Sequence, residues 1–281
     1  MKREKMKHLV LGSSGQIGSV LCEYIKARGD EVVTFDIVDA TTEDLRIHDN
    51  HYLDECVAAS DFVHFLAYDV GGARYLQRNQ DKSWFMMNNM RLMCNTFDAL
   101  SRHSKPFLFA SSQMADMSHS SYGSLKHIGE KMTLDLGGTI VRFWNVYGPE
   151  KDLDKAHVIT DFVLKAQSDK KIEMMTTGQE RRQFLHADDC SRALCMIAKD
   201  SKEFSSRSLD ITSFEWTKII DVAHIVSSLL GGVSVIPGVK NDEVQKDIDV
   251  PPNTDILEYW KPTVSLADGV RGVIETMGKN K

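Results

Sequence analysis

The sequence lacks several features that would place it in other classes of protein. No apolar run approaches the ~18 residues that a membrane-spanning helix needs. The basic start, residues 1–7, has neither the apolar stretch nor the cleavage site of a secretory signal peptide, so we expect a cytoplasmic protein without membrane contact. The net charge of −6 and the lack of a long basic run argue against nucleic acid as a partner.

The spacing of the cysteines does not indicate a disulfide framework. The cysteines are odd in number, scattered and without a CxxC pair, which is typical of reduced thiols in a cytosolic protein. They are Cys22, Cys56, Cys94, Cys190 and Cys195. The 281 residues suffice for one large α/β domain with a smaller appendage.

A regular alternation of strands and helices is present. Residues 7–11 form a short apolar run that ends at Gly12, apolar residues from 17 to 25 fall at helical spacing, and 31–35 favour a strand. The alternation continues, with strands predicted at 61–67, 105–111, 139–143 and 208–211 and helices around 86–100, 122–136, 158–168 and 187–199. This pattern predicts an α/β fold, a Rossmann-type doubly wound parallel sheet.

The C-terminal third changes character, with a short strand at 233–236 and several prolines between that strand and residue 262. We therefore predict two domains. Residues 1–143 plus 183–212 form the Rossmann domain, and residues 144–182 plus 213–281 form a smaller α/β cap domain that binds substrate.

A glycine-rich turn, Gly12-Ser-Ser-Gly15-Gln-Ile-Gly18, joins the first strand to the first helix. Gly12 permits the tight turn, Gly15 lets a pyrophosphate approach the backbone, and Gly18 lets helix and strand pack closely. The spacing is GxxGxxG rather than GxGxxG, and a plain glycine turn is the alternative. In its βαβ context the turn predicts a dinucleotide site to which its inner residues contribute: Ser14, Gln16 and Ile17.

Asp36 ends the second strand, 18 residues after Gly18. A carboxylate there can accept hydrogen bonds from the ribose 2′- and 3′-hydroxyls, and its charge repels a 2′-phosphate, so it selects NAD over NADP. Ile37 adjoins it, and Asp44 and Leu45 could border the adenine. The alternatives are a capping aspartate at 36 and a solvated loop aspartate at 44.

Tyr122-Gly-Ser-Leu-Lys126 places a tyrosine and a lysine on one face of a predicted helix. An ammonium at Lys126, helped by the positive nicotinamide ring, would lower the tyrosine pKa and make a base for a hydroxyl proton. The motif comes after a buried strand that ends in Ser111-Ser112, so the Ser112 hydroxyl can hydrogen-bond the reacting oxygen. We predict Ser112, Tyr122 and Lys126 as the catalytic residues, against a surface Tyr–Lys pair.

Together these motifs resemble the extended short-chain dehydrogenases/reductases of the NAD-dependent epimerase/dehydratase family. The resemblance runs from about residue 7 to residue 275 and includes further segments. They are Asn89 and Asn95 in the long helix, Arg142-Phe-Trp-Asn-Val-Tyr-Gly-Pro149, Gly178-Gln-Glu-Arg-Arg182-Gln-Phe-Leu-His-Ala-Asp-Asp189, Trp260-Lys-Pro262, Ser265-Leu266 and Gly269.

The resemblance implies NAD as cofactor and a nucleotide-diphosphate sugar as substrate. It adds cofactor contacts from Leu66, Ala67, Tyr68, Asn89 and Ser111. It also makes Asn145 and Arg182 contacts to the substrate's diphosphate, which a planar guanidinium suits; a structural Asn cap and a surface Arg pair are the alternatives. It implies a homodimer in which the long helix and the Tyr122 helix form a four-helix bundle. His186-Ala-Asp188-Asp189 falls on a structural motif of the family, so we predict no metal.

The loop Ala67-Tyr-Asp-Val-Gly71-Gly72 resembles that of GDP-mannose 3,5-epimerases and GDP-fucose synthases, which favours a GDP-sugar bound near Gly71, Gly72, Ser112, Gln113 and Tyr122. Met114 stands where the 3,5-epimerases carry an acid/base cysteine, and Gln113 and Met114 replace the Asp–Glu pair of the 4,6-dehydratases. A thioether cannot carry a proton. We therefore expect hydride transfer at one ring hydroxyl, most often C4, by a dehydrogenase or an epimerase. The alternatives are a 4-keto sugar reductase, which Asp36 disfavours because such reductases use NADPH, and a non-catalytic NAD sensor.

Overall fold

The computed structural model describes residues 5–242, 244–245 and 250–279, so residues 1–4 of the basic start lie outside the described residues. Within the described part, six strands form the central sheet in the order β2-β1-β3-β4-β5-β9, and every neighbouring pair is parallel. The strands are β1 (Lys7–Leu11), β2 (Glu31–Phe35), β3 (Phe62–Phe65), β4 (Phe107–Ser112), β5 (Thr139–Phe143) and β9 (Ser208–Ile211). The strand order reverses beside β1, which creates the switch point where ligands bind in such sheets.

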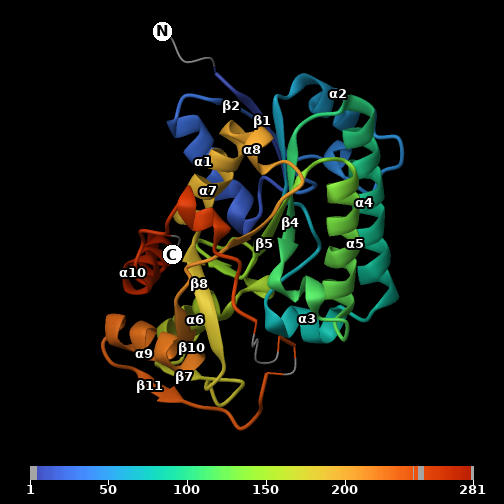
Figure 1. Ribbon diagram of the computed structural model, residues 1–281. Coiled ribbons are helices and arrows are strands. Elements are labelled where there is room, and N and C mark those ends of the chain that lie inside the picture. The colour runs from blue at the N-terminus through green and yellow to red at the C-terminus, as the bar shows by residue number, and fades with distance from the viewer. Residues whose placement is uncertain (1–4, 243, 246–249, 280–281) are drawn as a thin grey trace.

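Helices cover both faces of this sheet (Figure 1). On one face lie α1 (Gln16–Ala27), α7 (Ala187–Lys199) and the short α8 (Ser201–Phe204), and on the other α2 (His51–Ala59), α4 (Ser83–His103) and α5 (Ser121–Asp135). Side chains of one strand alternate between two apolar clusters: Leu9 and Leu11 belong to one, and Val10 belongs to the other. The doubly wound parallel sheet predicted from the sequence is confirmed.

A second, smaller set of elements lies beyond one end of the central sheet (Figure 1). It contains a three-stranded sheet, a two-stranded parallel sheet and three helices with their own apolar cluster. These are β6 (Asn145–Tyr147), β8 (Arg181–His186) and β10 (Trp216–Lys218); β7 (Lys171–Glu173) and β11 (Ser234–Ile236); α6 (Val158–Ser168), α9 (Ile219–Leu229) and α10 (Leu266–Lys279).

The assignment of residues 1–143 plus 183–212 and 144–182 plus 213–281 to two domains stays a prediction. β8 runs across the proposed boundary: it pairs with β6 and β10, its Phe184 packs in the small cluster, and its Leu185 packs against the central sheet. Among the described residues, we find no helix that combines the length and the apolar character needed to cross a membrane.

Candidate functional site

A cavity of about 1180 Å³ lies at the carboxyl ends of the central strands. Gly12 follows β1, Asp36 follows β2, Leu66 follows β3 and Ser112 ends β4, and all four line it. Arg182 on β8 closes it from the opposite wall. The volume exceeds the roughly 300–1,000 Å³ of a pocket for one small ligand, so it can hold two ligands side by side.

The cavity brings together all of the predicted site residues except two. Asn89 is buried away from it: its Oδ1 accepts a hydrogen bond from Asp69 N at 2.8 Å, and its Nδ2 donates to Asp69 O at 3.1 Å and Phe85 O at 3.1 Å. Gln113 is also buried off the cavity wall, with both side-chain amide atoms unpartnered. The expected direct contacts of these two residues are therefore corrected. Asn89 acts on the loop that comes after β3, because its amide satisfies that loop's backbone.

Two glycines of the glycine-rich turn, Gly12 and Gly18, have no room for a side chain. Gly12 has φ +87°, and a Cβ there would lie 2.7 Å from Ala67 N; a Cβ on Gly18 would lie 2.0 Å from Gly12 O. Gly15 caps α1 without a side-chain hydrogen bond, so the first amides of the helix remain available to an anion. The Nε2 of Gln16 is buried without a partner on the same wall. This cradle fits the pyrophosphate of a dinucleotide.

Asp36 is held beside that turn. Its Oδ2 accepts from Ser14 N at 3.0 Å and its Oδ1 from Val38 N at 3.1 Å, which leaves acceptor capacity on both oxygens for ribose hydroxyls. The nearby Arg46 forms two bonds of 2.8 Å to Asp44, which lowers the pKa of that carboxyl. Arg46 is thus already paired with a carboxylate. Sequence reasoning missed this pair.

Ser112 and Tyr122 come together at the end of β4 and the start of α5. Their hydroxyls are hydrogen-bonded, and Ser112 Oγ also accepts from Met114 N at 3.1 Å. Burial raises the pKa of Tyr122 to about 12, although the bond to Ser112 opposes this. The phenol is therefore protonated at neutral pH in this structure.

Lys126 is fully buried behind this pair. Its Nζ donates to Ala110 O at 2.5 Å and lies 3.5 Å from the centre of the Tyr68 ring, whereas the Tyr122 ring centre is 5.8 Å away. Burial lowers the pKa of Lys126 well below its ordinary value of 10.5. The expectation that this lysine lowers the tyrosine pKa is not met here, because desolvation dominates at both groups.

Tyr68 packs against Lys126 and Tyr122, a position that the sequence did not predict. Its ring meets the Tyr122 ring edge-on at 5.7 Å, and its hydroxyl is buried without a partner. Burial, together with the nearby Tyr122, raises the pKa of Tyr68 well above its ordinary value. An aromatic residue at a strand end was the signal, but nothing in the local pattern shows that it covers Lys126.

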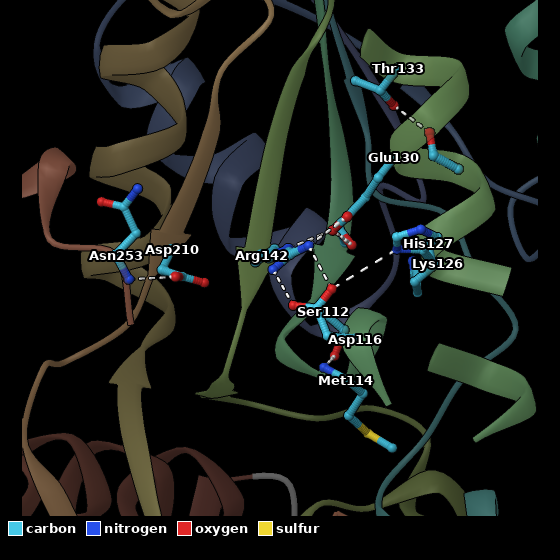
Figure 2. A network of polar contacts seen from close by, with 12 residues as sticks. Ser112, Met114, Asp116, Lys126, His127, Glu130, Thr133, Arg142, Asp210 and Asn253 are labelled. Atoms are coloured by element: carbon cyan, nitrogen blue, oxygen red, sulfur yellow. Dashed lines mark hydrogen bonds and ion pairs between the residues drawn. The ribbon is translucent and has the colours of Figure 1, made fainter. Parts of the chain in front are cut away.

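An ion network supports the site from behind. Glu130 accepts hydrogen bonds from Ser111 Oγ at 2.6 Å and from Arg142 Nε and Nη2 at 2.7 Å each. Arg142 also reaches Asp116 at 2.7 Å, so it bridges the helix and the turn after β4 (Figure 2). The bond to Glu130 is the main reason that the pKa of Arg142 is raised. The network joins β4, β5, α5 and η2 (Gln113–Asp116) around Ser112.

The opposite wall offers polar groups to a second ligand. Asn145 Nδ2 is buried without a partner and lines the cavity, while Arg182 is nearly fully buried and paired with Asp242 at 2.7 Å. The Gly71-Gly72 loop lies against this wall: Gly72 N donates to Lys155 O at 3.0 Å, and a Cβ at Gly72 would lie 2.4 Å from Ala156 O. The glycine pair therefore permits a close approach of two backbones.

Among the described residues, no grouping of three or more His, Cys, Asp or Glu side chains could hold a metal ion. The motif at the end of β8 has structural partners instead. His186 Nδ1 accepts from Asp188 N at 3.3 Å at the start of α7. Asp189 accepts from Thr263 N and Val264 N at 2.8 Å each.

Comparisons with known proteins agree with this geometry. The model of the NAD dependent epimerase/dehydratase family matches residues 8–211. GDP-mannose 3,5-epimerase 1 of Oryza sativa subsp. indica is 28% identical over 95% of this chain and 80% of its own. Two solved structures share the fold: the UDP-glucose 4-epimerase of Thermotoga maritima, solved with UDP-glucose (20% identity, TM-score 0.82, 98% and 99% of the two chains), and WbmF of Bordetella bronchiseptica in complex with NAD⁺ (20%, 0.80, 100% and 94%).

The family match covers most of the chain, and it confirms both the resemblance read from the motifs and NAD as the cofactor. The cradle at Gly12 to Gly18 and the carboxylate at Asp36 fit that cofactor. The chain therefore belongs to the NAD dependent epimerase/dehydratase family.

Proposed function

We propose that this protein oxidises a GDP-sugar at a ring hydroxyl, C4, with NAD⁺, as a dehydrogenase or a 4-epimerase. One observation carries the proposal: the hydrogen-bonded hydroxyls of Ser112 and Tyr122 face a cavity between the dinucleotide cradle and a wall with Asn145 and Arg182. A sugar held between these two walls presents a hydroxyl to the tyrosine.

Tyr122 and Ser112 have different roles in removing the proton of the sugar hydroxyl. Tyr122 takes the proton of the sugar hydroxyl, and Ser112 hydrogen-bonds the same oxygen and stabilises the tyrosinate. Bound NAD⁺ supplies a hydride acceptor, and its positive ring adds to the charge that favours the tyrosinate. Lys126 lies on the same helix one turn after Tyr122 and lines the same cavity.

Directly after Ser112, Met114 is the one residue of η2 that lines the cavity. Met114 lines the cavity with 1% of its surface exposed, and a thioether neither accepts nor donates a proton at neutral pH. The proposal therefore stops at hydride transfer, unlike the reaction in the name of the 28% identical relative, a 3,5-epimerase.

Two observations support guanine as the base. The Gly71-Gly72 loop lines the cavity. The GDP-mannose 3,5-epimerase of Oryza sativa, which is 28% identical over 95% of this chain, is named for a GDP-sugar. The solved UDP-glucose 4-epimerase is 20% identical and supports the fold alone. A UDP-sugar is therefore the comparison substrate in any assay.

We also propose a cytoplasmic homodimer. Trp84, Met87 and Met90 recur along one side of α4 and are exposed, as are Ile128 and Leu134 on the adjacent α5. A paired helix face with large exposed apolar residues is suited to bury itself against a second copy. The five cysteines form no disulfide with one another, which is compatible with a reducing compartment.

The test uses purified protein with NAD⁺ and a panel of GDP- and UDP-hexoses. We expect turnover with a GDP-sugar, a product that NMR identifies as a C4 epimer or a 4-keto sugar, and no turnover in Tyr122→Phe. Turnover confined to UDP-sugars would refute the base assignment, and turnover that survives in Tyr122→Phe would refute the mechanism.

A further inference from the structure

Arg182 is already ion-paired with a carboxylate, that of Asp242, on the wall where the diphosphate of the proposed substrate would bind. Its Nη2 donates to Asp242 Oδ2 at 2.7 Å and its Nη1 to Arg181 O at 2.7 Å. The side chain of Arg182 is 3% exposed and that of Asp242 is 15% exposed, and both residues line the cavity. The Asp242 carboxylate therefore occupies the guanidinium that a phosphate of the substrate would bind.

Asp242 is fixed in this position by a turn of its own. Its Oδ1 accepts from Val244 N at 2.8 Å and from Gln245 N at 3.2 Å, while Oδ2 faces Arg182. Val244 is 6% exposed and packs in the same apolar cluster as Leu45 and Leu76. The carboxylate is therefore anchored on both sides, and each of its oxygens has a separate task.

Two other cations that line the cavity are also paired with carboxylates. Arg74 contacts Asp161 at 2.9 Å, and Lys155 contacts Asp69 at 3.1 Å. A cation that is paired with a carboxylate exerts less net attraction on a dianion than an unpaired one. A diphosphate can bind Arg182 directly only when it replaces the Asp242 carboxylate. The planar guanidinium can donate hydrogen bonds to either anion.

We propose that Asp242 is an internal competitor: it occupies Arg182 in place of the substrate's diphosphate, and substrate binding exchanges the one anion for the other. This inference rests on the proposed function, since it needs a phosphorylated ligand. It makes Asp242 a residue that sets affinity. Ligands without a diphosphate cannot displace it and are discriminated against.

Asp242→Asn tests the exchange with little change of shape. The amide oxygen can still accept from Val244 N and Gln245 N, but the charge on Arg182's partner is gone. We expect calorimetric titration of the NAD-loaded protein to show GDP binding about tenfold tighter or more, the scale of one charge-assisted hydrogen bond. Guanosine, which has no phosphate, should bind wild type and variant equally.

Two controls separate the exchange from a general loss of negative charge. Glu180→Gln removes one charge from the same wall, where Glu180 hydrogen-bonds Thr176, and should tighten GDP binding much less. In an Arg182→Met background, Asp242→Asn should have no effect on GDP affinity. Should Asp242→Asn fail to fold, Asp242→Ser retains an oxygen for the turn and serves in its place.

Unchanged or weaker GDP binding in Asp242→Asn, with measurable binding by wild type, would overturn the exchange and leave the proposed function standing. If neither protein binds GDP or UDP, the proposed function itself fails. In turnover assays the exchange predicts a lower KM for Asp242→Asn with kcat little changed, whereas a purely structural role would lower kcat as well.

Discussion

Glu130 is the buried centre of the ion network behind Ser112, and we expect its replacement by glutamine to destabilise the protein. The Glu130 side chain is 5% exposed and accepts three hydrogen bonds, two of them from Arg142. Glutamine keeps the shape but removes the charge that compensates Arg142. Arg142 would then keep its ion pair with Asp116, which Figure 2 shows on the side of the turn after β4.

The size of the effect is set by burial. Removing one partner of a buried ion pair costs about 3–5 kcal/mol, and the lower end applies here because Arg142 is 23% exposed and keeps Asp116. Asp116 is 65% exposed, so Asp116→Asn should cost less than about 1 kcal/mol. For a chain of 281 residues about 3 kcal/mol corresponds to a fall in Tm of roughly 5 °C.

Thermal unfolding of wild type, Glu130→Gln and Asp116→Asn measures this difference directly. We expect a large fall in Tm for the first variant and a small one for the second. Equal falls in Tm for the two variants would refute this expectation. They would show that the burial of Glu130 and Asp116 does not determine how much each ion pair with Arg142 stabilises the fold. Ser111→Ala, which removes one hydrogen bond from a neutral hydroxyl to the Glu130 carboxylate, should cost about 1.5–3 kcal/mol.

Three further predictions concern other parts of the molecule. Gly18→Ala would put a Cβ 2.0 Å from Gly12 O, and strain of about 1–3 kcal/mol should weaken NADH binding tenfold or more in a fluorescence titration; Gly272→Ala, which meets nothing within 4 Å, should not. Burial lowers the pKa of His64 well below its ordinary 6.5, so the unfolded chain takes up the proton first and stability should fall as pH drops below about 6.5; a flat profile of Tm against pH would contradict this. Because Tyr122 has a pKa of about 12, the oxidation rate should rise with pH, and Ser112→Ala should move that rise to higher pH; a pH-independent rate would argue against tyrosinate as the base.

The sequence sufficed for those parts of the site that are set by local pattern. Gly12 and Asp36 come directly after predicted strands, and Ser112 ends one, so a parallel sheet brings them to the same edge whatever the loops do. The Tyr122–Lys126 spacing fixes one helix face in the same way. Strand and helix limits at 139–143, 158–168 and 187–199 agree with the structure for the same reason: each is bounded by a clear change of periodicity.

Pairings between distant segments could not be predicted. Arg182 and Asp242 are 60 residues apart, and Tyr68 reaches Lys126 on α5 from the loop that comes after β3. Which direction Asn89 faces depends on the backbone of Asp69, which no local pattern shows. The expected lowering of the Tyr122 pKa was wrong because the burial of this residue, and that of Lys126, is a property of the folded cavity rather than of the motif.

We propose that this site transfers hydride from C4 of a nucleotide-sugar to NAD⁺. The most direct measurement is a single turnover of the NAD⁺-loaded protein with a GDP-sugar deuterated at C4, with NADH absorbance recorded and the deuterium located by mass spectrometry. We predict a transient or lasting NADH signal that the isotope slows, with deuterium on the nicotinamide or returned to C4. Deuterium lost to solvent, or product formed without any NADH signal or isotope effect, would contradict the account.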